Sequence, residues 1–330
     1  YNNFSISNLP SSSSWLIFLF FSFLLAALAK SAQFFFHCWL GDAMAGPTPV
    51  SALLHAATMV TAGIFILLRI NPYFPYLNSN SVTNLLLFLG ALTIIFAGFS
   101  AIYQYDLKRI IAFSTCSQIG YMFINNGLYP SSDISNTSLF HLFTHGFFKA
   151  LLFLTAGIII HSLYNEQDIR KYGGLLFKFP LSFLFFLIGT LAIISFPFLS
   201  GYYSKEAILF NSFLSLCTNS SSFYLFILLF GALLTTLYSF KLFFNSFFVY
   251  SNSSNPYPFS SASLEIPKSL FFFLLPLLIG SIIVGYYSNE FFLGLGLNNI
   301  SIIHSYIPST LIYLPLFTLI LGFLLSLSDI

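Results

Sequence analysis

The chain has 330 residues, of which only 6 % are charged, while 57 % are hydrophobic and 45 are phenylalanine. A soluble domain carries about 25 % charged residues, so this composition excludes a soluble enzyme, a nucleic-acid-binding protein and a disordered chain. The net charge of +2 offers no basic face for nucleic acid. Repeated long apolar runs instead predict an all-α polytopic membrane protein.

The three cysteines, Cys38, Cys116 and Cys217, have no CxxC spacing. This excludes a disulfide framework and argues against an iron–sulfur or zinc–thiolate site. The sequence starts at Tyr1 and its first charge is Lys30, a pattern that matches neither a signal peptide nor a transit peptide. We therefore expect a chain that is made at its own membrane or is a piece of something longer.

The apolar runs predict about nine membrane-spanning segments, most of them about 20 residues long. They cover residues 15–39, 50–69, 84–103, 109–128, 138–163, 181–216, 223–250, 269–287 and 310–328. The first, fifth and sixth are longer and contain a charge, a glycine or a proline near the middle. Such breaks are tolerated at membrane depth only inside the protein or beside a water-filled cavity. The polar stretches 71–84 and 251–263 are expected to be loops.

The connecting loops divide the basic residues unequally between the two sides of the predicted bundle. One side holds six of them: Lys108, Arg109, Arg170, Lys171, Lys178 and Lys268. The other side holds only Arg69. Basic residues remain preferentially on the side of synthesis, so the first side is the inside, either cytoplasm or matrix.

Lys30 and His55 are the first polar candidates along the chain. Lys30 follows the apolar stretch 15–29, where it either snorkels to the interface or, if the helix continues through 34–39, lies near the middle of the membrane. A central charge costs about 2.5–3.5 kcal/mol on insertion scales, which favours a functional role. His55 lies early in the second segment, where a lone histidine is either a satisfied core residue or an active one.

The fifth segment contains His141, His145 and Lys149 at spacings of four residues, which places all three on one face of a helix. Two histidines at this spacing are also found in zinc helices, but the glutamate of HExxH and a third ligand are missing. A haem pair normally takes its histidines from two helices, and the cation of Lys149 opposes a metal. A proton relay fits these residues better, because histidine titrates near neutral pH. Interhelical hydrogen bonding is the structural alternative.

Lys205 and Glu206 follow a stretch that Pro197 and Gly201 are expected to interrupt. The two charged residues form either an ion pair at a helix end or a switchable site at a broken helix. Transporters place such sites in matching positions of inverted repeats. Lys30 in the first segment and Lys205 in the sixth, five segments apart, are consistent with such a pair.

Several long motifs resemble the chain 5 family of NADH–ubiquinone oxidoreductase, the antiporter-like membrane subunits of respiratory complex I. They read AKSAQFFFHCWLGDAMAGPTPVSALLHAATMVTAGIFILLR at 29–69, DLKRIIAFSTCSQIGYM at 106–122, HLFTHGFFKALLFLTAGIIIH at 141–161, NEQDIRKYGGL at 165–175 and FPFLSGYYSKE at 196–206. The first, third and fifth motifs contain the charged candidates described above. NEQDIRKYGGL favours chain 5 over the related chains 2 and 4.

The resemblance implies an antiporter-like fold of two inverted five-helix repeats, each with one broken helix that carries a key lysine. On that pattern Lys30 and Lys205 are those lysines, and Glu206 occupies the usual acidic position. His55, His141, His145 and Lys149 join them in a proton-transfer path. The chain would then divide into the end of the first repeat (1–69), the second repeat (70–250) and C-terminal peripheral spans (251–330).

The chain departs from the family pattern at Cys38 and Gly41, which replace prolines after the first lysine. Helices that precede Lys30 in the family, including the one with its glutamate partner, are not in this sequence. Because an unpaired buried ammonium is costly, we expect a separate polypeptide to supply them, so that the chain is one piece of a split subunit. A truncated fragment of a longer chain is the alternative.

The resemblance implies a proton-translocating subunit in the mitochondrial inner membrane. It would have no cofactor of its own, while FMN, iron–sulfur clusters and ubiquinone would bind to partner subunits. Its expected partners are other membrane-arm subunits, above all a chain 4-like neighbour, together with membrane lipids. Two alternatives remain at this point: a subunit of the related cation/proton antiporters, and a scaffold subunit that does not pump.

Overall fold

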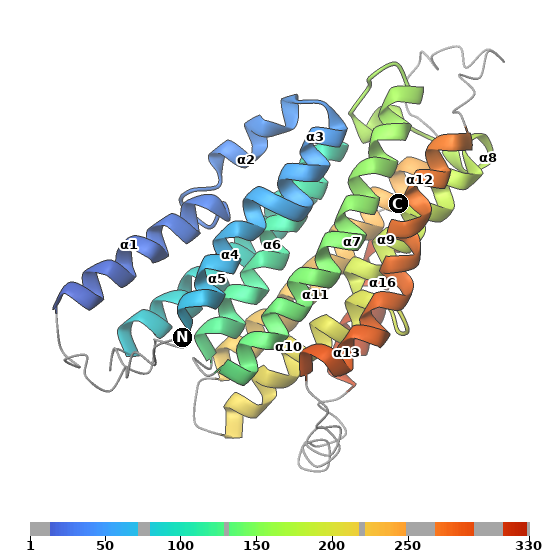
Figure 1. Cartoon of the computed structure of the whole chain (residues 1–330). Coiled ribbons are helices and arrows are strands. Elements are labelled where there is room, and N and C mark those ends of the chain that lie inside the picture. The colour runs from blue at the N-terminus through green and yellow to red at the C-terminus, as the bar shows by residue number, and fades with distance from the viewer. Residues whose placement is uncertain are drawn as a thin grey trace.

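The computed structural model describes residues 14–71, 80–128, 132–217, 222–248, 268–293 and 313–328. In these ranges the chain forms a bundle of helices that run side by side, with α1 at one edge (Figure 1). The first helices are α1 (Ser14–Lys30), α2 (Cys38–Asp42), α3 (Thr48–Ala52), α4 (Met59–Ile70), α5 (Asn80–Tyr103), α6 (Leu107–Leu128) and α7 (Ser132–Ser162). They are followed by α8 (Leu175–Lys178), α9 (Pro180–Ile194), α10 (Ser200–Cys217), α11 (Ser222–Phe247), α12 (Lys268–Ile279), α13 (Gly285–Leu293) and α16 (Leu314–Ser328). The predicted all-α membrane fold is confirmed.

The described helices differ from the predicted spans in number and continuity. Five segments are long and apolar enough to cross a membrane: Thr48–Ile70, Val82–Tyr103, Asn136–Ser162, Ser222–Phe247 and Leu270–Leu293. Three apolar helices are shorter, namely Phe18–Lys30, Pro180–Ile194 and Leu314–Leu327. Nine spans are therefore not confirmed within the described ranges. The first predicted span, 15–39, contains the expected break, because α1 ends at Lys30 and α2 begins at Cys38. Residues 72–79 of the predicted loop 71–84 and all of 251–263 lie outside the described residues, and the loop prediction was wrong for 80–84, because α5 begins at Asn80.

Two breaks, one after α1 and one after α9, share a backbone pattern. Ala32 and Phe35 have φ angles of 52° and 76°, and Ser195 and Phe198 have φ angles of 72° and 71°. Residues with a side chain rarely adopt this left-handed region, and each instance costs on the order of 1–3 kcal/mol. The surrounding packing has to stabilise these conformations. Their recurrence at the same spacing marks both breaks as specific features of the fold, and the interruption predicted from Pro197 is confirmed.

Gly201 fixes how closely α10 approaches α9 at the second break. A Cβ atom there would overlap with the carbonyl oxygen of Ala192, and such overpacking typically costs 1–3 kcal/mol. We expect Gly201→Ala to lower the thermal stability and the yield of the assembled protein. Gly146→Ala is the matched control, because no atom lies within 4 Å of a Cβ there. Equal thermal midpoints for the two variants would contradict this account of the break.

The helices α5 and α6 form a tightly packed hairpin that places α6 in the centre of the bundle. A Cβ at Gly120 would lie 2.6 Å from Oγ1 of Thr93 and 3.1 Å from the carbonyl oxygen of Gly90. In lipid there is no hydrophobic driving force between helices, so helix association depends on the van der Waals packing that close backbone approach of this kind allows. Nearly every residue of α6 is consequently buried, so its polar side chains are held in the protein interior.

Loops that the sequence places on the inner side meet at one end of the bundle. The Leu107 N–H donates to the carbonyl oxygen of Gln167 at 3.0 Å. The ammonium of Lys108 donates to the carbonyl oxygen of Gly46, also at 3.0 Å. Arg69 is in the last turn of α4, at the opposite end of that helix from the loop containing Gly46. These contacts confirm that the three loops share one side.

Ion pairs stabilise the charged surface at this end. They join Arg109 to Asp106 at 3.3 Å, Arg170 to Asp168 at 2.6 Å and Lys171 to Glu166 at 2.7 Å. The hydrogen bond from Lys171 lowers the pKa of the Glu166 carboxyl, and Arg170 lowers the pKa of Asp168 in the same way. Exposed pairs contribute about 0–1 kcal/mol each. The described residues provide no acidic partner for Lys108.

Candidate functional site

The predicted polar stripe on α7 lies in the interior of the bundle. His141 is 1 % exposed, and both His145 and Lys149 are fully buried. The helix α7 packs against α6, α9 and α10, so the stripe faces other helices. A charge at this depth costs about 2.5–3.5 kcal/mol, which is large beside a typical stability of 5–15 kcal/mol. Side chains this costly point to a function.

Lys149 is held by the neighbouring helix α6. Its ammonium donates to Oγ of Ser114 and, at 3.4 Å, to the carbonyl oxygen of Ile111. The Ser114 hydroxyl in turn donates to the Ile111 carbonyl oxygen at 2.7 Å. The partners of Lys149 are thus neutral oxygens, which accept a hydrogen bond from either the charged or the neutral amine. This environment lets the amine change its protonation state without breaking an ion pair.

His141 connects three helices. Its Nδ1 lies 2.9 Å from Oγ of Ser204 on α10, and its Nε2 lies 3.1 Å from Oε1 of Gln118 on α6. The Thr144 hydroxyl also donates to Ser204 Oγ, at 2.8 Å. An amide oxygen only accepts, so in this assignment Nε2 of the ring carries a proton and Nδ1 faces the serine hydroxyl. His141 is therefore linked to Ser204, which directly precedes Lys205 in the chain.

Lys205 lies at the meeting point of α10, α6 and α11. It is 1 % exposed, and its ammonium donates to Oγ1 of Thr235 at 3.0 Å. The same nitrogen lies 5.1 Å from the centroid of the Tyr121 ring, and the phenol of Tyr121 donates to the carbonyl oxygen of Leu228 at 3.0 Å. An aromatic face and one hydroxyl stabilise the cation without neutralising it. Lys205, like Lys149, has no carboxylate in contact with its nitrogen among the described residues.

Glu206 lies beside Lys205 and interacts with the phenol of Tyr202. A cavity of about 10 Å³ touches Lys205, Glu206 and Ser195, and a space of this size holds about one water molecule. Oγ of Ser195 is buried and has no hydrogen-bond partner among the described residues. The second break and the lysine–glutamate pair thus border the same small polar space.

His145 and His55 are fully buried, and neither ring nitrogen of either residue has a hydrogen-bond partner in the described part of the chain. The rings of His145 and His141 have centroids 6.3 Å apart. His55 lies in a π-helical turn (Leu53–Thr58), with its ring 5.9 Å from that of Trp39 and 6.4 Å from that of Phe153 on α7. Unpaired buried polar atoms and π-turns are both concentrated at functional sites.

Lys30 lies apart from this cluster. It is the last residue of α1 and is exposed on the bundle surface, whereas Lys149 and Lys205 are buried. Within the described ranges it has neither a hydrogen bond nor an acidic partner. The structure therefore brings together the candidates on α7 and α10, places His55 beside the same helix, and leaves Lys30 on an outer face.

A second polar cluster extends the site along α7, away from the inner loops. Nδ2 of Asn125 donates to Oγ1 of Thr137 and Oγ of Ser138, both at 2.7 Å. Nδ2 of Asn211 donates to Oδ1 of Asn125 at 3.0 Å and to Oγ1 of Thr137 at 2.9 Å. All four residues are buried. Polar side chains consequently continue from His141 through Ser138, one helical turn away on α7, to the C-terminal half of α10.

Sequence reasoning missed most of the polar partners in the site. They are Ser114, Gln118, Tyr121, Asn125, Thr137, Ser138, Ser204, Asn211 and Thr235. The helix α6 carried a usable signal, because polar side chains recur every three or four residues along an apolar span. Within the described residues no group of three His, Cys, Asp or Glu side chains could hold a metal ion.

The helical bundle, its two breaks and the buried lysines define an α-helical membrane protein of antiporter-like fold. Residues 2–235 match the family described as NADH:quinone oxidoreductase/Mrp antiporter, TM. The chain belongs to this family. The fold is also similar to that of a chain of the Mrp complex from Dietzia sp. DQ12-45-1b, with a TM-score of 0.70 and 24 % identity over 93 % of this chain and 33 % of the other.

Among curated proteins, the chain is similar to NADH-ubiquinone oxidoreductase chain 5 from several organisms. It is 46 % identical to the protein of Acanthamoeba castellanii over 299 residues, which are 90 % of this chain and 42 % of the relative. It is 47 % identical to the Arabidopsis thaliana protein over 274 residues, 83 % of this chain and 40 % of the relative. The resemblance predicted from the sequence motifs is confirmed. The chain spans less than half the length of these relatives.

Proposed function

We propose that this chain is part of a proton-translocating membrane subunit of a respiratory NADH:ubiquinone oxidoreductase in the mitochondrial inner membrane. The observation that carries the proposal is the buried file formed by Lys149, His145, His141, Ser204 and Lys205. The lysines and histidines of this file can each accept and release a proton, and Ser204 forms a hydrogen bond with one of them. The identity of 43–47 % to the chain 5 relatives favours this function over that of an antiporter subunit.

In this mechanism protons enter from the inner side, reach Lys149, pass the two histidines and arrive at Lys205. His141 is eight residues from Lys149, which corresponds to about 12 Å along the helix. At an effective dielectric constant near 20, two like charges 12 Å apart repel by about 1.4 kcal/mol, which is a factor of about ten in occupancy. A proton on Lys149 thereby disfavours a second positive charge on His141, which couples the protonation states of residues along the file.

The path continues from Lys205 toward the opposite side of the membrane. The asparagine cluster around Asn125 and Asn211 supplies polar side chains at that end, while Glu206 lies beside the small cavity at Lys205. Moving one charge against 100 mV costs about 2.3 kcal/mol. Redox chemistry in partner subunits would supply this energy.

The division of the chain into repeats agrees with this path. The region 70–250, proposed as the second inverted repeat, contains α5 to α11 and with them every residue of the buried file. The region 1–69 would be the end of the first repeat. The left-handed residues recur at the same spacing after α1 and after α9. This supports the proposal that the ends of these two helices occupy equivalent positions in the two repeats. Residues 251–330 would add peripheral spans.

We propose further that the acidic partner of Lys30 lies on a separate polypeptide and that the exposed face of α1 is in contact with it. The exposure of Lys30 at the end of an apolar helix supports this arrangement. Other membrane-arm subunits, including a chain 4-like neighbour, would complete the assembly. FMN, iron–sulfur clusters and ubiquinone would be bound by partner subunits.

A native gel of mildly solubilised membranes tests the assignment to an NADH-oxidising assembly. The gel is stained for NADH dehydrogenase activity, and peptides from the active band are identified by mass spectrometry. We expect peptides of this chain in a large active band, together with those of other membrane-arm subunits. Absence of the chain from every NADH-active band would overturn the proposal.

A further inference from the structure

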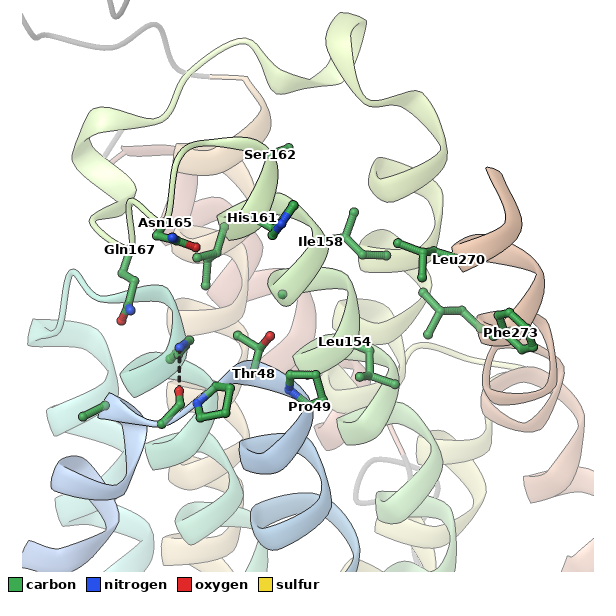
Figure 2. A pocket seen from close by; sticks show the side chains of 17 residues that line it. Thr48, Pro49, Leu154, Ile158, His161, Ser162, Asn165, Gln167, Leu270 and Phe273 are labelled. Carbon is green, nitrogen blue, oxygen red and sulfur yellow. Dashed lines mark hydrogen bonds between the residues drawn. The ribbon is translucent and has the colours of Figure 1, made fainter. Parts of the chain in front are cut away.

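A cavity of about 780 Å³ opens near the inner end of the bundle, away from the buried lysine–histidine file (Figure 2). Its walls come from the start of α3, the last turns of α7, the loop that follows α7 and the first turns of α12. Binding sites for small organic molecules typically have volumes of 300–1,000 Å³. The cavity is therefore large enough for part of an amphipathic molecule.

The lining of this cavity is polar at one side and apolar at the other. Figure 2 shows Asn165 and Gln167 on one side, and Leu270 and Phe273 on the other, with His161 between them. Further apolar lining comes from three side chains: Leu154, Ile158 and Leu274. Such a division fits a ligand with a polar head and a hydrocarbon chain.

The polar side has a basic character. Lys108 and His161 both line the cavity, and none of its lining residues is acidic. Lys108 is only 4 % exposed and donates to the Gly46 carbonyl oxygen, drawn as the dashed line in Figure 2. The acidic residues nearby in sequence, Asp106 and Glu166, already form ion pairs with other residues. The cavity thus presents a buried cation without a carboxylate, which complements an anion.

The apolar side is open to the membrane. Phe273 is 73 % exposed and Leu270 is 45 % exposed. Along α7 the lining extends from His161 to Leu154, about 10 Å, which is less than the thickness of one leaflet in a hydrocarbon core of about 30 Å. On α7 the polar end of the lining, His161, adjoins the inner loops, and its apolar end, Leu154, lies toward the middle of the helix. The cavity therefore has the depth and the orientation of a lipid in the inner leaflet.

We propose that this cavity binds an anionic phospholipid of the inner leaflet, with its phosphate at Lys108 and His161 and an acyl chain along Leu154, Ile158 and Phe273. The proposal is independent of the proton path, because its ligand and its residues are different. Charge-assisted hydrogen bonds to the phosphate would provide selectivity over zwitterionic lipids. Anionic lipids of the inner leaflet are also attracted to basic groups at that surface.

Photo-crosslinking of the purified assembly tests this site. The assembly is reconstituted into vesicles of phosphatidylcholine with a minority of phosphatidylglycerol, and a phosphatidylglycerol probe with a photoreactive acyl chain is added. We expect crosslinks at 154–158 and 270–274, and much weaker labelling by a phosphatidylcholine probe. Loss of one charge-assisted contact should reduce the labelling by about tenfold in Lys108→Gln and in His161→Gln.

Arg109→Gln is the matched control, because Arg109 neighbours Lys108 in the chain but is exposed and does not line the cavity. It should label like the unmodified protein. If the buried change Lys108→Gln prevents assembly, His161→Gln decides, since His161 is exposed. Equal labelling by the two probes, or labelling that persists in the assembled variants, would refute an anionic lipid site. Neither result would affect the measurement of proton translocation.

Discussion

Replacing Lys205 with alanine should abolish proton translocation through this subunit of the assembled oxidoreductase. The substitution removes the cation between Thr235 and the Tyr121 ring but leaves their other bonds intact. The Thr235 hydroxyl still donates to the Ala232 carbonyl oxygen at 2.7 Å, and the Tyr121 phenol to that of Leu228. We therefore expect an intact complex that moves fewer protons per electron, measured as NADH-driven acidification in proteoliposomes.

Lys205→Arg separates proton transfer from structure. A guanidinium keeps the positive charge and its attraction to the Tyr121 ring, but it does not release a proton at physiological pH. If Lys205 transfers protons, the arginine variant should assemble and fail to pump. If the residue only holds the helices together, arginine should restore pumping. Lys178→Ala is the control for loss of a lysine, because Lys178 is an exposed residue of the inner loops. An unchanged proton-to-electron ratio in Lys205→Ala would remove Lys205 from the path.

The α7 stripe was predictable because helical periodicity alone places His141, His145 and Lys149 on one face. When three ionisable residues lie on one face of an otherwise apolar helix, that face is expected to pack against other helices and not against lipid. The second break was predictable for a similarly local reason, since Pro197 cannot continue a helix. In both cases the relevant information lies within about three turns of the chain.

The position and backbone geometry of the first break were not visible in the sequence, although the resemblance implied a broken helix at Lys30. No proline or glycine lies between Lys30 and the first turn of α2, and the chain turns through left-handed conformations at Ala32 and Phe35 instead. Side chains disfavour these conformations locally, so only tertiary packing makes them the stable choice. For the same reason the sequence predicted a span over 15–39 with a break near its middle but did not place that break directly after Lys30, where α1 ends.

The contacts within the site could not be predicted from the spacing of residues. The hydrogen bond from Lys149 to Ser114 joins residues 35 positions apart, and that from Lys205 to Thr235 joins residues 30 positions apart. Helix packing decides which hydroxyl lies opposite which ammonium. Sequence patterns identified the costly charged residues but did not identify the neutral oxygens that stabilise them, because serine and threonine are common in apolar helices.

Replacing Lys149 with glutamine should also stop translocation, because the glutamine amide retains a donor for Ser114 but carries no exchangeable charge. The decisive measurement is the double variant with Lys205→Arg. If the two lysines act in series, either single change blocks the whole path, and the double variant should pump as poorly as each single variant. If they serve separate paths, each single variant should keep part of the activity and the double variant should lose the remainder. Acidification rates of the three variants, normalised to the amount of assembled complex, distinguish the two cases, and additive losses would refute a single file through His145 and His141.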